Sequence, residues 1–133
     1  MPGKTQTHTD AVLNVLRNQA ISGVSPYTGL FSVAPANDND PGTELSGNGY
    51  ARQAVTFGAP VTDAGNVRKI ENTNEPTFGP ATGSDWPQAV AFGVFSLVTA
   101  GTLLYWDALT VPKTVQVGDS AKYPAGALKV KED

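Results

Sequence analysis

Residues 89–98 read AVAFGVFSLV, and this stretch decides the fold that the sequence predicts. Successive side chains of a strand point to opposite faces. Both faces of this stretch are mainly apolar, with Val90, Phe92, Val94 and Ser96 on one and Ala91, Gly93, Phe95 and Leu97 on the other. Such a strand is typical of the centre of a sheet that is covered on both sides. Residues Thr99–Gly101 predict a tight turn after this strand, and residues Leu103–Leu109 predict its hairpin partner.

Shorter strand signals, separated by turn residues, occupy most of the remaining chain. They cover residues 27–34, 51–59, 66–71, 113–117 and 127–131, with a further short strand around Phe78. The sequence therefore predicts a mainly β fold, an antiparallel β-sandwich or jelly-roll-like domain of about seven or eight strands. There is no fixed-period repeat and no heptad pattern, so the chain alone is not expected to form a long fibrous shaft.

The N-terminal part differs from the rest of the chain. Residues 1–8 are short and polar, which predicts a flexible N-terminal arm. Residues 9–19 are expected to form the one short helix, because apolar side chains recur along one of its faces. Thr7 or Thr9 is the expected cap of this helix. Residues 9–133 as a whole are expected to be a single domain, a size that one hydrophobic core can support.

The composition argues against several classes of function. Nine basic and twelve acidic residues give a formal charge of −3. This charge provides neither the basic surface that nucleic acid requires nor the basic cluster that an anionic membrane attracts. The longest apolar region, residues 89–106, is too broken and too polar to cross a bilayer. The chain has no cysteine, so neither a disulfide nor a cysteine-bound metal is expected.

Two polar features of the N-terminal half could in principle form a catalytic or metal site. His8 is the single histidine, and it lies in the predicted arm, where a catalytic base would not be held in place. We therefore expect it to be solvated. Residues 37–44, NDNDPGTE, alternate oxygen ligands as a Ca²⁺ loop does, although the spacing to Glu44 is too short for the usual pattern. The other interpretation is a solvent-facing turn whose side chains bond local backbone groups.

Two carboxylates lie beside the two tryptophans, Asp85 next to Trp86 and Asp107 next to Trp106. A pair of carboxylates that converge on a sugar is the requirement for glycoside hydrolysis. The alternative is that each tryptophan covers an end of the core, because aromatic side chains more often supply buried area than sites. No catalytic constellation is evident, so the sequence predicts a protein that is not an enzyme, with no catalytic residues, cofactor or metal.

Residues 42–58, GTELSGNGYARQAVTFG, resemble the signature of a family of small phage proteins that are often labelled tail-fibre-like. LFSVAP at 30–35, FGVF at 92–95, GTLLYWDALTVPKTV at 101–115 and PAGAL at 124–128 resemble further stretches of the same family. The resemblance implies a bacteriophage virion structural protein, made in the cytoplasm of the host bacterium and located in the phage particle.

Two functional hypotheses follow from this resemblance, and a third comes from the carboxylates beside the tryptophans. The leading one is a capsid decoration or cement protein, a homotrimer that binds the major capsid protein or other virion proteins and stabilises the assembled head. The arm would then order on a neighbouring subunit, through Met1, Pro2, Gly3, Lys4 and Thr5. The alternative is a tail, baseplate or tail-fibre-tip component whose exposed loops, such as residues 35–49, contact the host surface or a glycan on it. A carbohydrate-active enzyme using Asp85 or Asp107 is the third.

Overall fold

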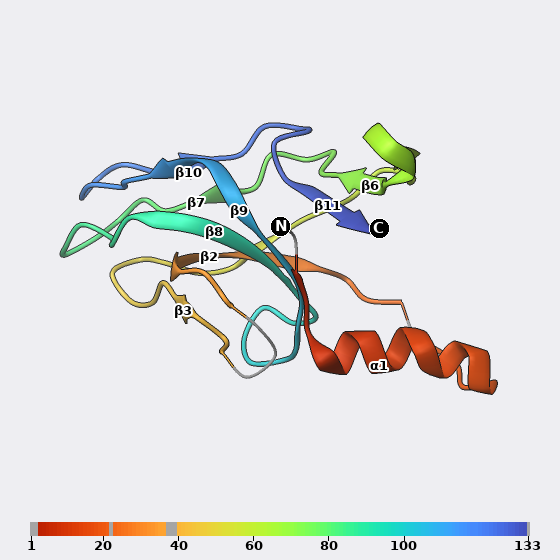
Figure 1. Cartoon of the computed structure of the whole chain (residues 1–133). Helices are drawn as coiled ribbons and strands as arrows, with labels where there is room; N and C mark the ends of the chain where they lie inside the picture. Colours follow the sequence, from red (N-terminus) through yellow and green to blue (C-terminus); the bar gives the residue numbers. More distant parts are fainter. Residues whose placement is uncertain (1–2, 22, 37–39, 133) are drawn as a thin grey trace.

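The computed structural model describes residues 3–21, 23–36 and 40–132, which form a strand-rich body with one α-helix projecting from it (Figure 1). The strands of these ranges are β1 (Gly3–Lys4), β2 (Tyr27–Val33), β3 (Thr43–Glu44), β4 (Gln53–Ala54), β5 (Val61–Thr62), β6 (Arg68–Glu71), β7 (Thr77–Phe78), β8 (Ala89–Phe95), β9 (Leu103–Lys113), β10 (Ala121–Lys122) and β11 (Lys129–Glu132). The helical segments are α1 (Gln6–Asn14) and the short 3₁₀ turns η1 (Val15–Arg17) and η2 (Ala64–Asn66).

The strand β8 lies in the middle of the largest sheet, as its two apolar faces predict. This antiparallel sheet has the order β1-β9-β8-β2-β3, and β4 also pairs with β2. β8 and β9 form the predicted hairpin, with Phe92 opposite Asp107 and Gly93 opposite Trp106. On the other side of β8, Leu30 of β2 pairs with Phe92. The prediction of a central strand is therefore confirmed.

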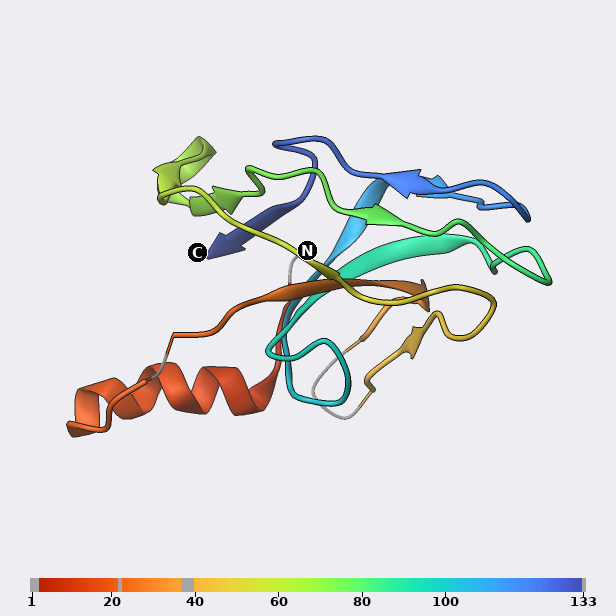
Figure 2. The ribbon, with the colours of Figure 1, turned by 180° about the vertical axis from the view of Figure 1, so that it is seen from behind.

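The main core lies between one face of this sheet and two smaller antiparallel sheets, β7-β10 and β5-β6-β11 (Figure 2). Burial of apolar area in such a layer is the main stabilising contribution to a fold. The buried residues of this core are Leu30, Leu45, Phe78, Ala81, Trp86, Ala89, Phe92, Val94, Val115, Ala121, Leu128 and Val130. The layered arrangement confirms the predicted mainly β, antiparallel sandwich fold.

The opposite face of the largest sheet carries a second, smaller apolar cluster. Phe31, Ala91 and Phe95 are buried there, and the rings of Phe31 and Phe95 stack with their centroids 5.9 Å apart. This cluster explains why the sequence of β8 is apolar at consecutive positions. One set of its side chains faces the main core, and the other faces the second cluster.

The strands are more numerous and shorter than the sequence suggested. The described residues contain eleven strands, where seven or eight were expected, because five of them besides β1 have only two residues. Of the predicted strand 51–59, only Gln53–Ala54 is a strand. The predicted strand 113–117 is absent beyond the end of β9, because loops bond its backbone instead: the Trp86 amide donates to the Val115 carbonyl at 2.9 Å.

The N-terminal residues are paired rather than arranged as a flexible arm. Gly3 and Lys4 form β1 and pair with Trp106 and Tyr105 of β9. Gly3 makes this approach possible, because a Cβ at this position would overlap the indole of Trp106. The prediction of an arm is therefore wrong for residues 3–8, and Met1 and Pro2 lie outside the described residues.

The helix begins earlier than the sequence suggested. Thr5 caps it: the Thr5 hydroxyl oxygen accepts the backbone amide of His8 at 3.4 Å, and the Thr5 carbonyl accepts the Thr9 amide at 2.9 Å. This cap, rather than one at Thr7 or Thr9, starts α1 at Gln6. The segment then tightens into η1 and ends at Asn18 in the left-handed conformation, with φ of 61°.

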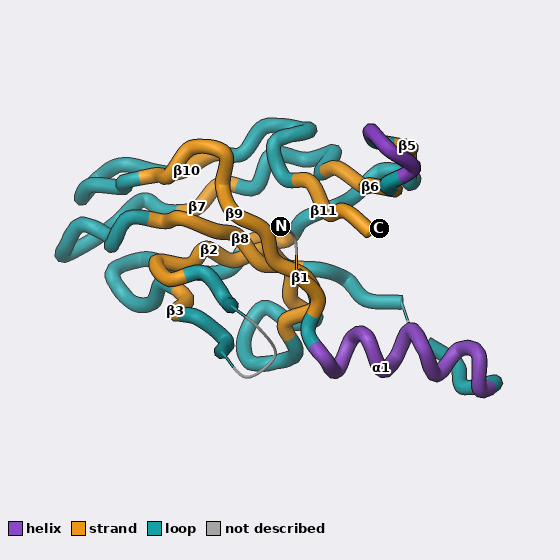
Figure 3. Tube along the Cα trace, in the orientation of Figure 1, coloured by secondary structure: helices purple, strands orange, loops and turns teal. Residues whose placement is uncertain are grey.

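The helix α1 is held against β9 at its start and then projects away from the strands, as the tube in Figure 3 shows most clearly. None of its side chains is buried. No helix within the described ranges is long and apolar enough to cross a membrane.

Candidate functional site

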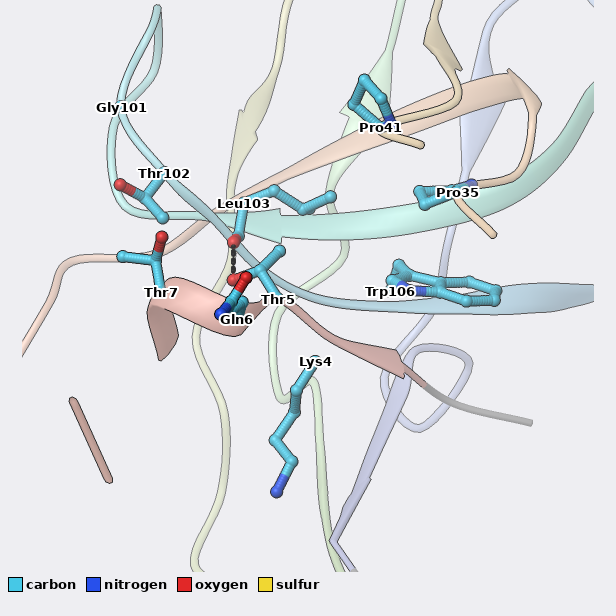
Figure 4. Close-up of a pocket in the computed structure, with 10 residues that line it drawn as sticks. All are labelled: Lys4, Thr5, Gln6, Thr7, Pro35, Pro41, Gly101, Thr102, Leu103 and Trp106. Atoms are coloured by element: carbon cyan, nitrogen blue, oxygen red, sulfur yellow. Dashed lines mark hydrogen bonds between the residues drawn. The ribbon is translucent and has the colours of Figure 1, made fainter. Parts of the chain in front are cut away.

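A pocket of about 330 Å³ lies where the start of α1 meets the hairpin of β8 and β9 (Figure 4). We call it the Trp106 pocket, after its largest side chain. Its lining residues come from three parts of the chain: Lys4, Thr5, Gln6, Thr7, Pro35, Pro41, Gly101, Thr102, Leu103 and Trp106. Trp106 is half-buried, so part of its indole ring is open to a ligand.

The wall of the pocket at the start of α1 is fixed to β9. The Thr5 hydroxyl donates to the Leu103 carbonyl at 2.6 Å, and the Thr5 amide donates to the Leu104 carbonyl at 3.2 Å. Figure 4 shows Thr7 and Thr102 at one end of the pocket and Trp106 with Pro35 at the other. The pocket therefore has a polar end and an aromatic end.

Several polar groups of the pocket are available to a ligand. Within the part of the chain that the structure describes, the side chains of Gln6, Thr7 and Thr102 make no hydrogen bond. The ammonium group of Lys4, in contrast, forms an ion pair with the Glu132 carboxylate. The pocket thus offers neutral donors and acceptors beside an aromatic ring, whereas its one cationic side chain is already paired.

A partly buried polar network holds the turn that forms one edge of the pocket. Arg52 donates to the carbonyls of Leu97 and Ala100 at 3.1 and 2.7 Å. Its guanidinium also lies 3.5 Å from the ring centroid of Phe95, close enough for a cation–π interaction. The turn from Leu97 to Ala100 leads directly into Gly101 and Thr102 of the pocket, so Arg52 positions this wall.

The same network includes Glu44 and Tyr50. Arg52 forms a two-pronged ion pair with Glu44, with N···O distances of 2.9 and 2.8 Å. The Tyr50 hydroxyl donates to Glu44 at 2.7 Å and accepts the Leu30 amide at 2.9 Å. Burial, followed by the hydrogen bond to Glu44, raises the pKa of Tyr50 well above its ordinary value, so the hydroxyl stays protonated and donates.

Comparison with known protein families matches residues 3–131 to the family described as podophage GP4 fiber I protein gp80. The chain belongs to this family. A search of curated proteins found no match to the chain. Membership of the fiber I family makes the protein a bacteriophage virion structural component, as the resemblance of residues 42–58 implied. The description as a fibre protein fits the tail-fibre hypothesis better than the capsid-decoration hypothesis.

The family signature of residues 42–58 has a structural role in this chain. Three polar side chains of the signature form the network: Glu44, Tyr50 and Arg52. Two of its apolar side chains, Leu45 and Val55, are buried. Sequence reasoning identified the segment but missed the network. The Leu97 and Ala100 carbonyls that Arg52 binds lie 45 and 48 residues away along the chain, and no local spacing indicates them.

The sequence named Met1, Pro2, Gly3, Lys4 and Thr5 as partner contacts. The structure places Lys4 and Thr5 in the lining of the Trp106 pocket and Gly3 against the Trp106 ring. Met1 and Pro2 lie outside the described residues. Of the contact residues predicted on a free arm, Gly3, Lys4 and Thr5 are thus part of the folded body.

The expectation that His8 is fully solvated is wrong. Its ring packs edge-on against Tyr105, with centroids 4.8 Å apart, and the residue is half-buried. Burial lowers the pKa of His8 below its ordinary value, and the nearby Glu132 carboxylate opposes this change. His8 is therefore mainly neutral at pH 7 and is part of the packing beneath α1.

The two carboxylates considered for glycoside hydrolysis, Asp85 and Asp107, each accept a backbone hydrogen bond. Asp85 accepts the Val117 amide at 2.9 Å, and Asp107 accepts the amide of its neighbour Ala108 at 2.8 Å. Neither carboxylate lines the Trp106 pocket. Trp86 is buried in the core, as predicted, and its indole N–H donates to the Asn48 carbonyl at 2.8 Å.

The segment considered for calcium lies partly outside the described residues, which omit Asn37, Asp38 and Asn39. Of its described members, Asp40 accepts the Gly42 amide at 3.1 Å, as a local turn residue does. Glu44 is already paired with Arg52. Among the described residues, no three acidic or histidine side chains gather into a metal site.

Proposed function

We propose that the protein is a tail-fibre component that contacts the host surface, and that its Trp106 pocket binds a neutral saccharide of that surface. The observation that supports this proposal is the combination of an accessible indole with unpaired hydroxyl and amide groups in one pocket. Ligand pockets of proteins typically have this composition, an apolar or aromatic wall with a few polar groups that fix orientation.

A sugar ring matches both ends of the pocket. Its C–H groups carry partial positive charge, which the negative face of an aromatic ring such as Trp106 attracts. Its hydroxyls can both donate and accept, and so can the hydroxyls of Thr7 and Thr102 and the amide of Gln6. A volume of about 330 Å³ lies at the small end of the range for ligand sites, which suits a short stretch of a glycan.

The charges favour a neutral saccharide over an acidic one. Lys4 is the charged side chain of the lining, and Glu132 neutralises it. The chain as a whole has a formal charge of −3, which gives no long-range attraction for a polyanion.

Replacing Trp106 by alanine is expected to reduce saccharide binding about tenfold or more, the effect of losing roughly 1.5 kcal/mol of stacking energy. Binding can be measured by titrating the purified chain with the surface polysaccharide of the bacterium on which the phage grows. Isothermal titration calorimetry is the readout, because Trp106→Ala removes the accessible indole on which a fluorescence titration would depend.

Val111→Ser is the matched control, since Val111 is an exposed residue of the same strand and does not line the pocket. It should bind as the unmodified chain does. Saccharide binding that survives in Trp106→Ala with unchanged affinity would contradict the assignment of the pocket.

The location on the particle tests the fibre role separately. Antibody against the chain, carrying gold, should label the tail of intact phage in electron micrographs. Labelling of the head alone would instead support the capsid-decoration hypothesis, in which the major capsid protein is the partner.

We also propose, as the sequence suggests, that the protein is a non-enzymatic homo-oligomer that uses no cofactor and binds neither nucleic acid nor membrane. A homotrimer is the proposed state, on the basis of the symmetry common in viral shells and fibres and of the low charge of the chain. The mass of the purified protein by light scattering tests it, and three copies is the expected result.

A further inference from the structure

A second pocket, of about 480 Å³, lies between β9 and the sheet of β5, β6 and β11, which Figure 3 labels. We call it the Arg68 pocket. Its apolar lining consists of Pro60, Ile70, Val130 and the ring of Tyr105. Tyr105 and Trp106 are neighbours on β9, so their side chains point to opposite faces of the sheet. The Arg68 pocket and the Trp106 pocket are therefore separate sites.

The pairing of β6 with β11 places an apolar pair and a charged pair on the same face of the small sheet. Ile70 lies opposite Val130, and Arg68 lies opposite Glu132. Val130 is part of the main core and Ile70 packs against it. Since residues two apart on a strand point to the same side, Arg68 and Glu132 share this face and lie beside the apolar lining.

The Glu132 carboxylate is already neutralised. One of its oxygens accepts the ammonium group of Lys4, and the other accepts the Tyr105 hydroxyl at 2.7 Å. Both oxygens are thus occupied by donors of the chain. An anionic ligand in the pocket would therefore meet an ion pair at this side and not a free carboxylate.

The ammonium group of Lys69, the other lysine near the pocket besides Lys4, is also paired. It lies 2.8 Å from the Glu71 carboxylate and 3.7 Å from the Asp63 carboxylate. Lys131 contacts the same Asp63 at 3.0 Å. The two lysines and the two carboxylates of this cluster balance each other, so the cluster adds no net charge to the pocket.

Arg68 supplies the charge of the lining that no acidic group balances. Its guanidinium donates to the Thr62 hydroxyl at 2.7 Å and to the Pro60 carbonyl at 3.0 Å, and both acceptors are neutral. Within the described ranges it forms no ion pair. A guanidinium has further N–H groups beyond these two, and Arg68 is exposed, so they are available to a ligand.

We propose that the Arg68 pocket binds a small molecule with an apolar or aromatic body and one carboxylate. The body would pack against Ile70, Val130 and the Tyr105 ring, and the carboxylate would accept hydrogen bonds from the guanidinium, whose planar fork matches it. The volume lies within the usual range for small-molecule sites, which are mostly apolar with a few polar groups. This inference concerns a second site and does not rest on the proposed saccharide binding.

The test compares two ligands that share a body and differ in charge, 4-butylbenzoate and 4-butylbenzamide. Each is titrated at pH 7 into the ¹⁵N-labelled full chain, and binding is followed by the NMR shifts of the backbone amides. The benzoate should bind about tenfold more tightly, because hydrogen bonds to a charged acceptor are the stronger ones. The amide signals of Ile70 and Val130 should move in both titrations, whereas that of Thr102 in the Trp106 pocket should not.

Arg68→Gln should lower the affinity for the benzoate about tenfold, to that of the benzamide. The affinity for the benzamide should stay unchanged, which also shows that the variant is folded and its apolar lining intact. Arg17→Gln is the matched control, because Arg17 is an exposed arginine that hydrogen-bonds to Asn14 and lines neither pocket. It removes the same charge and should leave both affinities unchanged.

Equal affinities of the two compounds for the unmodified chain would overturn the proposal, and so would a preference for the benzoate that persists in Arg68→Gln. Shifts confined to the Trp106 pocket, or no binding of either compound at millimolar concentration, would do so as well. The saccharide titration depends on Trp106, which does not line the Arg68 pocket. A failure of one site is therefore distinguishable from a failure of the other.

Discussion

Replacing Asn72 by alanine is expected to lower the free energy of unfolding by about 3 kcal/mol, because it removes four hydrogen bonds and leaves the buried Leu128 amide without a partner. The Asn72 side chain is buried, and its amide nitrogen donates to the carbonyls of Asn74, Tyr123 and Pro124 at 2.8, 3.2 and 3.1 Å. Its oxygen accepts the Leu128 amide at 2.9 Å. One side chain thus joins the end of β6 to the loop before β11.

The loss is large relative to the whole, since domains of this kind have a total stability of about 5–15 kcal/mol. Urea unfolding followed by the fluorescence of buried Trp86 measures the change, and a lower midpoint with an unchanged slope identifies a change of stability.

Thr28→Val is the matched control for this prediction. Thr28 is as buried as Asn72, but its hydroxyl has no hydrogen-bond partner among the described residues. Removing an unpaired buried hydroxyl should change the unfolding free energy by less than about 1 kcal/mol, or should stabilise the fold. If both variants lose similar amounts of stability, the hydrogen bonds of Asn72 do not explain its effect.

The features that sequence predicted well are those that local side-chain periodicity determines. The hairpin of β8 and β9 follows from alternation along residues 89–109 and a turn between its strands, and the structure confirms it. The helix was found but displaced, because Thr5, Thr7 and Thr9 are all acceptable caps in sequence. Contact with β9 selects Thr5, whose hydroxyl and amide both bond to that strand.

The features that sequence could not predict depend on contacts between distant segments. Asn72 stood at the edge of a predicted loop, where an asparagine is ordinary, yet three of its four partners come from residues 123–128. Trp106 was expected to cover the core. It instead forms a wall of the pocket, because β1 pairs beside it, and neither the strand at Gly3–Lys4 nor its partner can be inferred from two residues.

Arg52→Ala is expected to lower the free energy of unfolding by about 3 kcal/mol, because it breaks a largely buried ion pair and leaves the Glu44 carboxylate without its cation. The side chains of Arg52 and Glu44 are 12% and 22% exposed, and this partial contact with water places the expected loss at the low end of the range for buried pairs. The carbonyls of Leu97 and Ala100 lose their donor at the same time.

Arg68→Ala is the control for the general effect of removing an arginine. Arg68 also makes two hydrogen bonds, to Thr62 and Pro60, but it is exposed, and its removal should cost less than about 1 kcal/mol. Urea unfolding of both variants under identical conditions gives the comparison. Equal losses of unfolding free energy would show that the network of Arg52 and Glu44 does not stabilise the fold more than exposed hydrogen bonds do.

Arg52→Ala should also have a local effect that a general loss of stability would not produce. Arg52 holds the turn in which the Ser96 amide donates to the Thr102 carbonyl at 3.0 Å and the Thr102 amide donates to the Ser96 hydroxyl at 2.9 Å. Without Arg52, the hydrogens of these two amides should exchange with solvent faster. The exchange rates of amides in the centre of β8 should change only as far as the free energy of global unfolding changes. Because Thr102 lines the Trp106 pocket, saccharide affinity should fall in the same variant, which connects the family signature to the pocket through one side chain.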